Sequence, residues 1–259
     1  MSKSLSPQEI WQHLRREALE FATSEPALAS FYHASILNHD TLRAAVSYHL
    51  ATLLSSQAVP AMSLREIFIQ ALQHDSEFEL ALCRDIEAYC DRDPACNHFL
   101  MPLLYFKGFH ALQAYRLAHW LWQQDRRALA LYLQNQISQT FHVDIHPGAK
   151  IGSGIMIDHA TGVVIGETAV VGDNVSMLHS VSLGGSGNMK GDRHPKVGDG
   201  VLISAGAKIL GNIKIGDYAR IGAGSVVLTD VPAHQTAVGV PARIIEQSLP
   251  AGSGQDMMA

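Results

Sequence analysis

Acidic residues and histidines recur in the middle of the chain at a spacing that could support proton transfer. Asp144 precedes His159 by 15 residues, and Asp158 stands directly before that histidine. A carboxylate that accepts a hydrogen bond from an imidazole fixes its tautomer and stabilises the imidazolium, so such a pair is typical of a general base. Asp158 could instead hold a substrate amine. We therefore take His159 and Asp144 as candidate catalytic residues.

A second candidate region is a glycine-rich segment further along the chain. Residues 184–196 read Gly-Gly-Ser-Gly-Asn-Met-Lys-Gly-Asp-Arg-His-Pro-Lys, which includes Arg193 and His194. Loops on a rigid scaffold often carry binding residues, and a guanidinium suits an anionic group. The alternative is a solvent-exposed loop without a functional role. The Arg-His pair at the base favours a substrate-binding loop.

A six-residue repeat predicts the scaffold for these residues. Aliphatic side chains recur at steps of six, with a two-residue shift after the third and a longer interruption at 184–196. The positions are Ile145, Ile151, Ile157, Ile165, Val171, Met177, Leu183, Val197, Ile203, Ile209, Ile215, Ile221 and Val227. Each repeat is predicted to form one short strand and one turn, and three repeats one coil of a parallel β-helix. Coils about 4.8 Å apart would bring Asp144 within hydrogen-bonding reach of His159.

The same coils raise the question of a metal site. His159 and His179 are 20 residues apart and could stack on adjacent coils. Zinc enzymes of the γ-type carbonic anhydrase class bind the metal through three histidines on this kind of helix. The histidine spacings do not match that class, and the Arg-His loop would have no purpose there. We expect no metal.

Glycine marks a domain boundary, because only Gly108 of 21 glycines lies before position 145. The glycine-poor part predicts an α-helical domain at 1–140, which makes the fold class α+β with a β-helix at 141–245 and a flexible tail at 246–259. Ser6 with Glu9, and Ser63 with Glu66, are predicted capping boxes. Helices are also expected near 24–36, 41–53, 76–89, 103–123 and 127–140. The run Asp91-Arg92-Asp93-Pro94 should end a helix.

Composition excludes several classes of function. A net charge of −5 argues against nucleic acid as a partner. Cys83, Cys90 and Cys96 are odd in number and lack zinc spacing, so reduced thiols without a metal or redox role are expected. No apolar run approaches the ~20 residues of a membrane span, and no signal peptide is evident. We expect a soluble cytoplasmic protein that binds no membrane.

Several motifs together resemble bacterial serine acetyltransferases. They are Asp-Ile-His-Pro at 144–147, Asp-His-Ala-Thr-Gly at 158–162, Gly-Glu-Thr-Ala at 166–169, Gly-Asp-Arg-His-Pro-Lys at 191–196, Gly-Ala-Lys-Ile-Leu-Gly-Asn at 206–212, Arg-Asp-Pro-Ala at 92–95 and Tyr-Phe-Lys-Gly-Phe-His-Ala at 105–111. The resemblance covers about residues 5–245. It implies a left-handed β-helix and transfer of an acetyl group from acetyl-CoA to the hydroxyl of L-serine, giving O-acetyl-L-serine and CoA.

The resemblance also implies roles for individual residues. His159 would be the general base that Asp144 orients, and Arg193 would bind the serine carboxylate. Asp93 and Asp158 would hold the ammonium group, with His194 completing the pocket. Because Asp93 belongs to the helical domain, we expect the site to lie between subunits of a homotrimer or of a hexamer formed by two trimers.

Further binding partners follow from the same resemblance. CoA would lie along the outside of the coils, with contacts at Gly184, Gly185, Ala205, Arg220, Ala223 and Arg243. L-cysteine would inhibit at the serine site. Family members that bind O-acetylserine sulfhydrylase end in isoleucine, whereas this sequence ends in Ala259, so weak or no binding to the sulfhydrylase is expected.

Three alternative functions remain open from the residues alone. Another hexapeptide acyltransferase, acting on a sugar or a diamino acid, would not need Asp93 or Arg193. A metal hydrase would contain metal. A non-catalytic scaffold that regulates cysteine synthesis would not need an intact Asp144 and His159.

Overall fold

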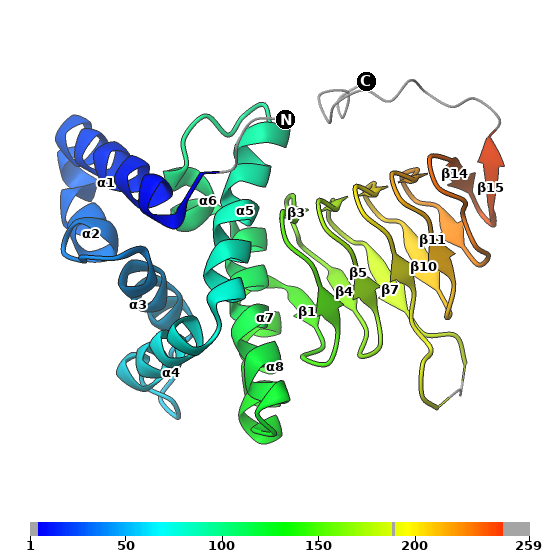
Figure 1. Cartoon of the computed structure of the whole chain (residues 1–259), viewed down its shortest axis with the longest axis horizontal. Coiled ribbons are helices and arrows are strands. Elements are labelled where there is room, and N and C mark those ends of the chain that lie inside the picture. Colours follow the sequence, from blue (N-terminus) through cyan, green and yellow to red (C-terminus); the bar gives the residue numbers. More distant parts are fainter. Residues whose placement is uncertain (1–4, 188–189, 246–259) are drawn as a thin grey trace.

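The computed structural model describes residues 5–187 and 190–245, which form a helical domain followed by a parallel β-helix (Figure 1). The predicted tail at 246–259, including Ala259, lies outside the described residues. The expected order of a helical part and a six-residue-repeat part is confirmed. No helix among the described residues is long and apolar enough to cross a membrane.

The helical domain consists of short helices joined by tight turns. They are α1 (Pro7–Ser24), α2 (Ala29–Tyr32), α3 (Leu42–Leu54), α4 (Ala61–His74), α5 (Ser76–Arg92), α6 (Leu100–Tyr105), α7 (Lys107–Gln123) and α8 (Arg127–Phe141), with a 3₁₀ turn at Pro26–Leu28 and a π turn at His33–Leu37. The capping box at Ser6 is confirmed, because Ser6 Oγ accepts from the Glu9 amide at 3.3 Å and Glu9 Oε2 accepts from the Ser6 amide at 2.7 Å. The capping box predicted at Ser63 is wrong, since α4 already begins at Ala61 behind Pro60.

The β-helix is built from three sheets, one along each side of the coil, in which all strand pairs are parallel except β14 with β15. The first contains β1 (Val143–Ile145), β4 (Val163–Ile165), β7 (Ser182–Gly184), β10 (Lys208–Leu210) and β13 (Val226–Val227). The second contains β2 (Lys150–Ile151), β5 (Val170–Val171), β8 (Lys196–Val197) and β11 (Lys214–Ile215). The third contains β3 (Met156–Ile157), β6 (Ser176–Met177), β9 (Leu202–Ile203), β12 (Arg220–Ile221), β14 (Thr236–Gly239) and β15 (Ala242–Ile245).

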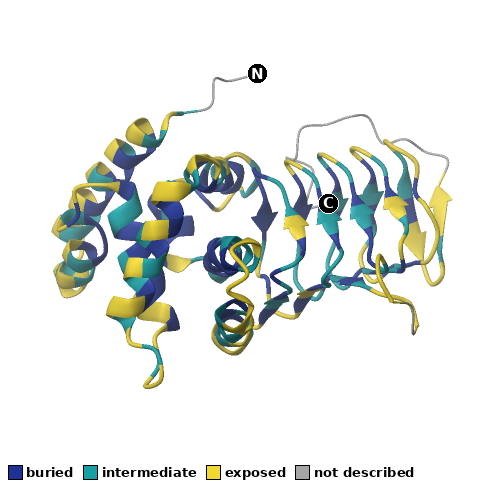
Figure 2. Cartoon of the chain, turned by 60° about the horizontal axis from the view of Figure 1, so that its bottom comes forward, coloured by how far each residue is buried: buried dark blue, intermediate teal, exposed yellow. Residues whose placement is uncertain are grey.

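The register confirms the six-residue repeat. Ile157 lies beside Met177, Met177 beside Ile203, and Ile203 beside Ile221, so the predicted aliphatic positions stack from coil to coil. The first of these steps is 20 residues long because the turn after β3 contains two extra residues. Figure 2 shows the buried residues running as bands along the inside of the coils. The predicted loop leaves the coil between β7 and β8 (Figure 1).

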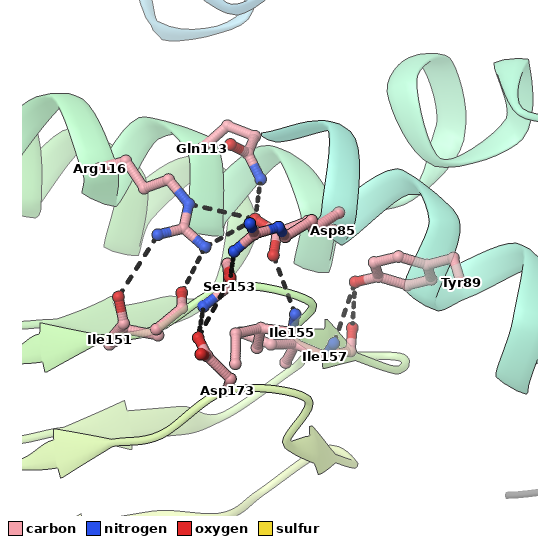
Figure 3. Close-up of polar contacts among 11 residues, drawn as sticks. Asp85, Tyr89, Gln113, Arg116, Ile151, Ser153, Ile155, Ile157 and Asp173 are labelled. Carbon is pink, nitrogen blue, oxygen red and sulfur yellow. Dashed lines mark hydrogen bonds and ion pairs between the residues drawn. The ribbon is translucent and has the colours of Figure 1, made fainter. Parts of the chain in front are cut away.

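The helical domain docks on the first coil through buried polar side chains (Figure 3). Tyr89 Oη donates to the Ile157 carbonyl at 2.9 Å and accepts from the Ile157 amide at 3.1 Å. Asp85, fully buried, accepts from the Ile155 amide at 2.9 Å and pairs with Arg116 at 2.7 Å. Burial raises the pKa of Asp85, and Arg116 opposes that shift. These contacts fix α5 and α7 relative to β3 and the residue before it.

A close approach of backbones completes this docking. Gly108, near the start of α7, lies so near the first coil that a Cβ there would be 2.0 Å from the Ile157 carbonyl oxygen. The single glycine of the helical part is thus explained by contact between α7 and the coil.

Candidate active site

The turn after β3 exposes His159, and we call residues 158–162 with the matching turns of later coils the His159 corner. His159 and Ala160 both have left-handed backbones, with φ of 56° and 58°, and they accommodate the two extra residues. The His159 side chain is 72% exposed, and its Nε2 lies 3.4 Å from Asp158 Oδ2. His179 occupies the equivalent turn one coil on, so the predicted position of the two histidines on adjacent coils is confirmed, and their rings are tilted by 60° with centroids 6.2 Å apart.

A second cluster lies at the next corner of the coil, where the sheet of β4 passes to the sheet of β5. We call it the Arg193 corner. Arg193 Nη2 donates to Glu167 Oε2 at 2.8 Å. Thr168 presents both its amide and its hydroxyl to His194 Nδ1, at 3.2 and 2.8 Å. Nδ1 is therefore the acceptor, and the proton of the neutral ring is assigned to Nε2.

The base of the loop is held rigidly against the coil. Thr168 Oγ1 accepts from the backbone amides of Arg193 and His194, at 3.0 and 3.2 Å. Lys196 Nζ donates to the Thr168 carbonyl at 2.9 Å. The His194 ring lies on Gly166, where any Cβ would be 2.0 Å from Nε2. The Arg-His pair is therefore positioned by the preceding coil, as expected of a binding loop.

The electrostatics of the Arg193 corner follow from these contacts. The hydrogen bond from Arg193 lowers the pKa of Glu167 below its usual value. Burial lowers the pKa of His194, and the charge of Arg193 lowers it further, while Glu167 opposes both effects. Burial also lowers the pKa of His146, which senses the charges of Glu167 and Asp144. At neutral pH the corner presents a neutral His194 beside a fixed guanidinium.

The contact predicted between Asp144 and His159 does not occur within the chain. Asp144 lies beside Val164, five residues past His159, because the coil is 20 residues long at this point. Its Oδ1 accepts from Gln134 Nε2 of α8 at 2.7 Å. The charge of Asp144 acts on His146, as does that of Glu167, so Asp144 lies toward the Arg193 corner. Three six-residue repeats would already place Asp144 beside Gly162, three residues past His159, and the two extra residues widen that offset. The roles of both residues stay predictions.

Asp93 is placed on the side of the His159 corner. It caps the C-terminus of α5, and its amide donates to the Tyr89 carbonyl at 2.9 Å. Tyr89 is bonded to Ile157, directly before Asp158, so the two carboxylates come from segments held to the same strand. The neighbouring Arg92 donates to Ser176 Oγ at 3.1 Å, one coil further along.

The residues predicted to contact CoA fall into separate groups. Ala205 and Ala223 occupy the turns of successive coils in line with His159 and His179, since the Gly206 amide donates to the His179 carbonyl and the Gly224 amide to the Ala205 carbonyl. The remaining residues lie elsewhere: Gly184 at the end of β7, Gly185 at the start of the loop, Arg220 in β12 and Arg243 in β15. Among the described residues, no group of three or more histidines, cysteines or acids is placed to hold a metal ion.

Sequence reasoning missed Glu167 and Thr168 as members of the site. Both belong to the Gly-Glu-Thr-Ala motif, which was used only as a sign of resemblance. They lie about 25 residues before Arg193 in the sequence, which is more than the 18 residues of a regular coil because the loop adds residues to that coil. Adding the length of the loop insertion to one coil predicts which residues lie beside Arg193.

Comparison with known proteins decides the family. A family model described as "Serine acetyltransferase, N-terminal" matches residues 10–114, and one described as "Bacterial transferase hexapeptide (six repeats)" matches residues 194–229. The serine acetyltransferase of Escherichia coli (strain K12) is 59% identical over 236 residues, covering 91% of this chain and 86% of the relative. The chain belongs to the serine acetyltransferase family.

Other serine acetyltransferases support the same assignment. That of Haemophilus influenzae is 58% identical over 250 residues, covering 96% of this chain and 93% of the relative. The crystal structure from Vibrio cholerae has a TM-score of 0.92 at 56% identity and covers 96% of this chain and 97% of its own. Similar solved structures include serine acetyltransferase complexes with cysteine and with CoA, and a soybean enzyme with serine.

Proposed function

We propose that the chain transfers an acetyl group from acetyl-CoA to the hydroxyl of L-serine, with His159 as the general base. Family membership along nearly the whole chain supports the reaction. The observation that carries the assignment of the base is the environment of His159. Its imidazole is largely exposed, yet Nε2 lies 3.4 Å from Asp158, so a substrate held by that carboxylate would meet the ring.

During the transfer, one proton moves from the serine hydroxyl to His159 and then from His159 to the CoA sulfur. His159 takes the proton of the serine hydroxyl as that oxygen attacks the thioester carbonyl. Collapse of the tetrahedral intermediate breaks the carbon–sulfur bond and releases the CoA thiolate. The imidazolium returns its proton to that sulfur, which leaves O-acetyl-L-serine, CoA and neutral His159.

Binding groups for serine are divided between the two corners. Asp158 and Asp93, on the side of the His159 corner, would hold the ammonium group. Arg193 would bind the carboxylate, because a guanidinium can donate two parallel hydrogen bonds to it, and His194 would complete that pocket. Arg193 is preset by Glu167, so the substrate carboxylate would meet an already ordered donor.

These two corners lie at opposite ends of one side of the coil. Along β4, the four steps from Gly162 to Gly166 span roughly 13 Å at about 3.3 Å per residue. A serine molecule is far smaller than that. We therefore place the site between chains of a homotrimer, where the His159 corner of one chain faces the Arg193 corner of the next. Two trimers joined through the helical domains would give the expected hexamer.

The position of Asp144 agrees with a shared site. Its carboxylate faces outward from β1. Its charge acts on His146, as the charge of Glu167 does, so it lies toward the Arg193 corner of its own chain. A neighbouring chain that presents His159 to that corner would also bring the imidazole to Asp144. The role of Asp144 in orienting the base is then exerted between chains, with Gln134 holding the carboxylate in place.

Acetyl-CoA would lie along the row of small residues that the His159 corner contains on later coils. Ala205 and Ala223 continue the line of His159 and His179 along successive turns. A Cβ at Gly224 would meet nothing within 4 Å, so this row is open. Backbone groups near Gly184 and Gly185 would contact the pantetheine arm, and Arg220 and Arg243 would lie toward the phosphates.

L-cysteine would inhibit by occupying the serine site. It differs from serine only by sulfur in place of the hydroxyl oxygen, so Arg193, Asp93 and Asp158 can bind both amino acids. A serine acetyltransferase complex with cysteine supports this feedback.

The reaction is tested by measuring CoA release from acetyl-CoA with a panel of amino acids and sugars as acceptors. We expect release with L-serine and little with sugars or diamino acids. Release with a sugar and none with serine would reject the proposal in favour of another hexapeptide acyltransferase.

The shared site is tested by mixing inactive variants. His159→Ala and Arg193→Ala chains, unfolded together and refolded, should regain activity in roughly a quarter of the sites, since random mixing then joins an intact His159 to an intact Arg193. The matched control mixes His159→Ala with Asp158→Ala, two residues of the same corner, and should regain nothing. Equal recovery in both mixtures, or none in either, would contradict a site between chains.

A further inference from the structure

Two cysteines flank Asp93 at a distance that favours a covalent link. Their sequence spacing predicts reduced thiols without a redox role, yet the fold places Cys90 Sγ 3.7 Å from Cys96 Sγ. Cys90 lies in the last turn of α5, and Cys96 follows the turn that ends the helix. The segment between them carries Asp93, whose Oδ1 accepts from the Ala95 amide at 2.9 Å.

The segment between the cysteines makes hydrogen bonds to the β-helix through Arg92 and to the Cys96 backbone through Asp93. Arg92 donates to the Asn174 carbonyl and to Ser176 Oγ, both at 3.1 Å. The Cys96 amide donates to the Asp93 carbonyl at 2.9 Å. A change of geometry at the two sulfurs is therefore transmitted directly to the position of Asp93.

The pair borders a cavity, and Cys90 is the more exposed of the two. Cys90 is half-buried and Cys96 is buried, and both line a cavity of about 510 Å³ together with His13, Arg16 and Phe99. Cys83, the third cysteine, is buried elsewhere in α5 and does not line this cavity.

The two thiols differ in exposure. Either sulfur can donate in the hydrogen bond between them, and Cys96 Sγ also donates to the His98 carbonyl at 3.6 Å. Cys90 is half-buried whereas Cys96 is buried, so Cys90 meets a small disulfide first and Cys96 is placed to resolve the mixed disulfide.

We propose that Cys90 and Cys96 form a reversible disulfide with small-molecule disulfides and that this bond weakens serine binding through Asp93. Cys90, the more exposed of the two, loses its proton and attacks one sulfur of the small disulfide, which releases one thiolate. Cys96, losing its proton, then attacks Cys90 Sγ and releases the second thiol. Two cysteine thiols are oxidised, and one small disulfide is reduced to two thiols.

The effect on serine follows from the geometry of the bond. The sulfurs must close from 3.7 Å to about 2.05 Å, which rotates both side chains. This closure is expected to shift the short segment between the cysteines as well, and with it Asp93. The effect on serine rests on the role proposed above for Asp93, whereas formation of the bond does not.

The test equilibrates the full-length enzyme in buffers of reduced and oxidised glutathione. After trapping of free thiols, mass spectrometry should find the peptide with both cysteines lighter by a pair of hydrogen atoms. The KM for serine of the oxidised enzyme should rise by about tenfold or more, the loss expected for a charged hydrogen bond, while the KM for acetyl-CoA stays unchanged. Dithiothreitol should reverse the change.

Two variants make the outcome specific. Cys90→Ser should abolish the response to oxidised glutathione, and Cys83→Ser, the matched control, should respond like the parent enzyme. A pair that stays reduced or carries only mixed glutathione disulfides would overturn the proposal. So would an internal disulfide that leaves the KM for serine unchanged.

Asp93→Asn, assayed in the reduced enzyme, separates this proposal from the proposed function. A raised KM for serine supports the role of Asp93. An unchanged KM in that variant would remove that role and the predicted effect on serine, while the mass measurement still decides whether the disulfide forms.

Discussion

The imidazole of His159 and that of His179 share a corner but differ in their surroundings. Only His159 has a neighbouring carboxylate, Asp158, within 3.4 Å. We expect His159→Ala to lower turnover by roughly 10²–10⁴-fold, the usual contribution of a general base. The loss is measured by CoA release at saturating serine.

The control for this prediction is His179→Ala, which removes the same group one coil on. It should keep most of the turnover, and both variants should retain the melting temperature of the parent because both rings lie at the surface of a turn. Near-normal turnover of His159→Ala would contradict the assigned base.

Arg193, held in place by Glu167, is predicted to bind both the substrate serine and the inhibitor cysteine, so its loss should weaken the binding of both. Arg193→Ala should raise the KM for serine and the inhibition constant of cysteine by comparable factors, roughly 10–100-fold for a lost charged hydrogen bond. Initial rates over a grid of serine and cysteine concentrations measure both. Cysteine inhibition that does not depend on serine concentration would instead indicate a separate inhibitor site.

Spacing in the sequence predicted the positions of the candidate residues better than the contacts between them. His159, Arg193 and His194 lie at turns or at the base of the loop, as the repeat indicates, and their roles stay predictions. Asp144 does not contact His159 within the chain, because a regular coil already offsets the two by three residues and the two inserted residues widen that offset. Glu167 was missed because its contact with Arg193 crosses from one coil to the next through a loop of irregular length.

At the scale of secondary structure, the docking of α7 depends on the missing side chain of Gly108. Gly108→Ala would place a Cβ 2.0 Å from the Ile157 carbonyl oxygen. We expect a loss of about 1–3 kcal/mol from overpacking, which corresponds to roughly 2–4 °C per kcal/mol in melting temperature. Scanning calorimetry measures the change.

A displaced α7 should also disturb the turn before His159, so turnover should fall in the same variant. The control is Gly185→Ala, whose Cβ would lie at an ordinary 3.4 Å from Arg193 and should leave the melting temperature nearly unchanged. Equal stability of the two variants would contradict the close approach of α7.

Elements with strong periodic signals were predicted well, and their ends were not. Stacking of one aliphatic residue per strand fixes the β-helix, so its strands follow directly from the repeat. The predicted helix at 103–123 is instead broken between α6 and α7, where Phe106 has an extended backbone and packs against Tyr89 at 5.5 Å. That contact is tertiary and has no local signal in the sequence.

For the molecule as a whole, two buried histidines predict loss of stability in acid. His49 of α3 and His110 of α7 lie 5.2 Å apart, and burial lowers the pKa of His49 to about 3 and that of His110 to about 4. Their pKa in the unfolded chain is near 6.5. Below that pH the unfolded chain binds protons that the folded chain excludes, so stability falls as pH drops from about 6.5 toward 4.

The slope should approach about 1.4 kcal/mol per pH unit for each histidine toward the acid end of urea unfolding measured between pH 7 and pH 5. His49→Phe should remove the share of His49 and leave that of His110, and Nε2 of His49 need not be replaced because it has no hydrogen-bond partner among the described residues. Replacing the exposed His33 by glutamine is the control and should leave the slope unchanged. An equal slope in His49→Phe and the parent would contradict the assignment to this pair.

The side chains that dock the helical domain also occupy backbone groups that another coil would otherwise use. Tyr115 donates to the Ala149 carbonyl, Arg116 to that of Gly152, and Tyr89 pairs both groups of Ile157. At the far end, β15 runs back antiparallel to β14. A stack of identical coils has no intrinsic length, and bare ends would recruit one another into fibrils. The helical domain therefore closes this end of the stack of coils, and it keeps a repetitive structure finite.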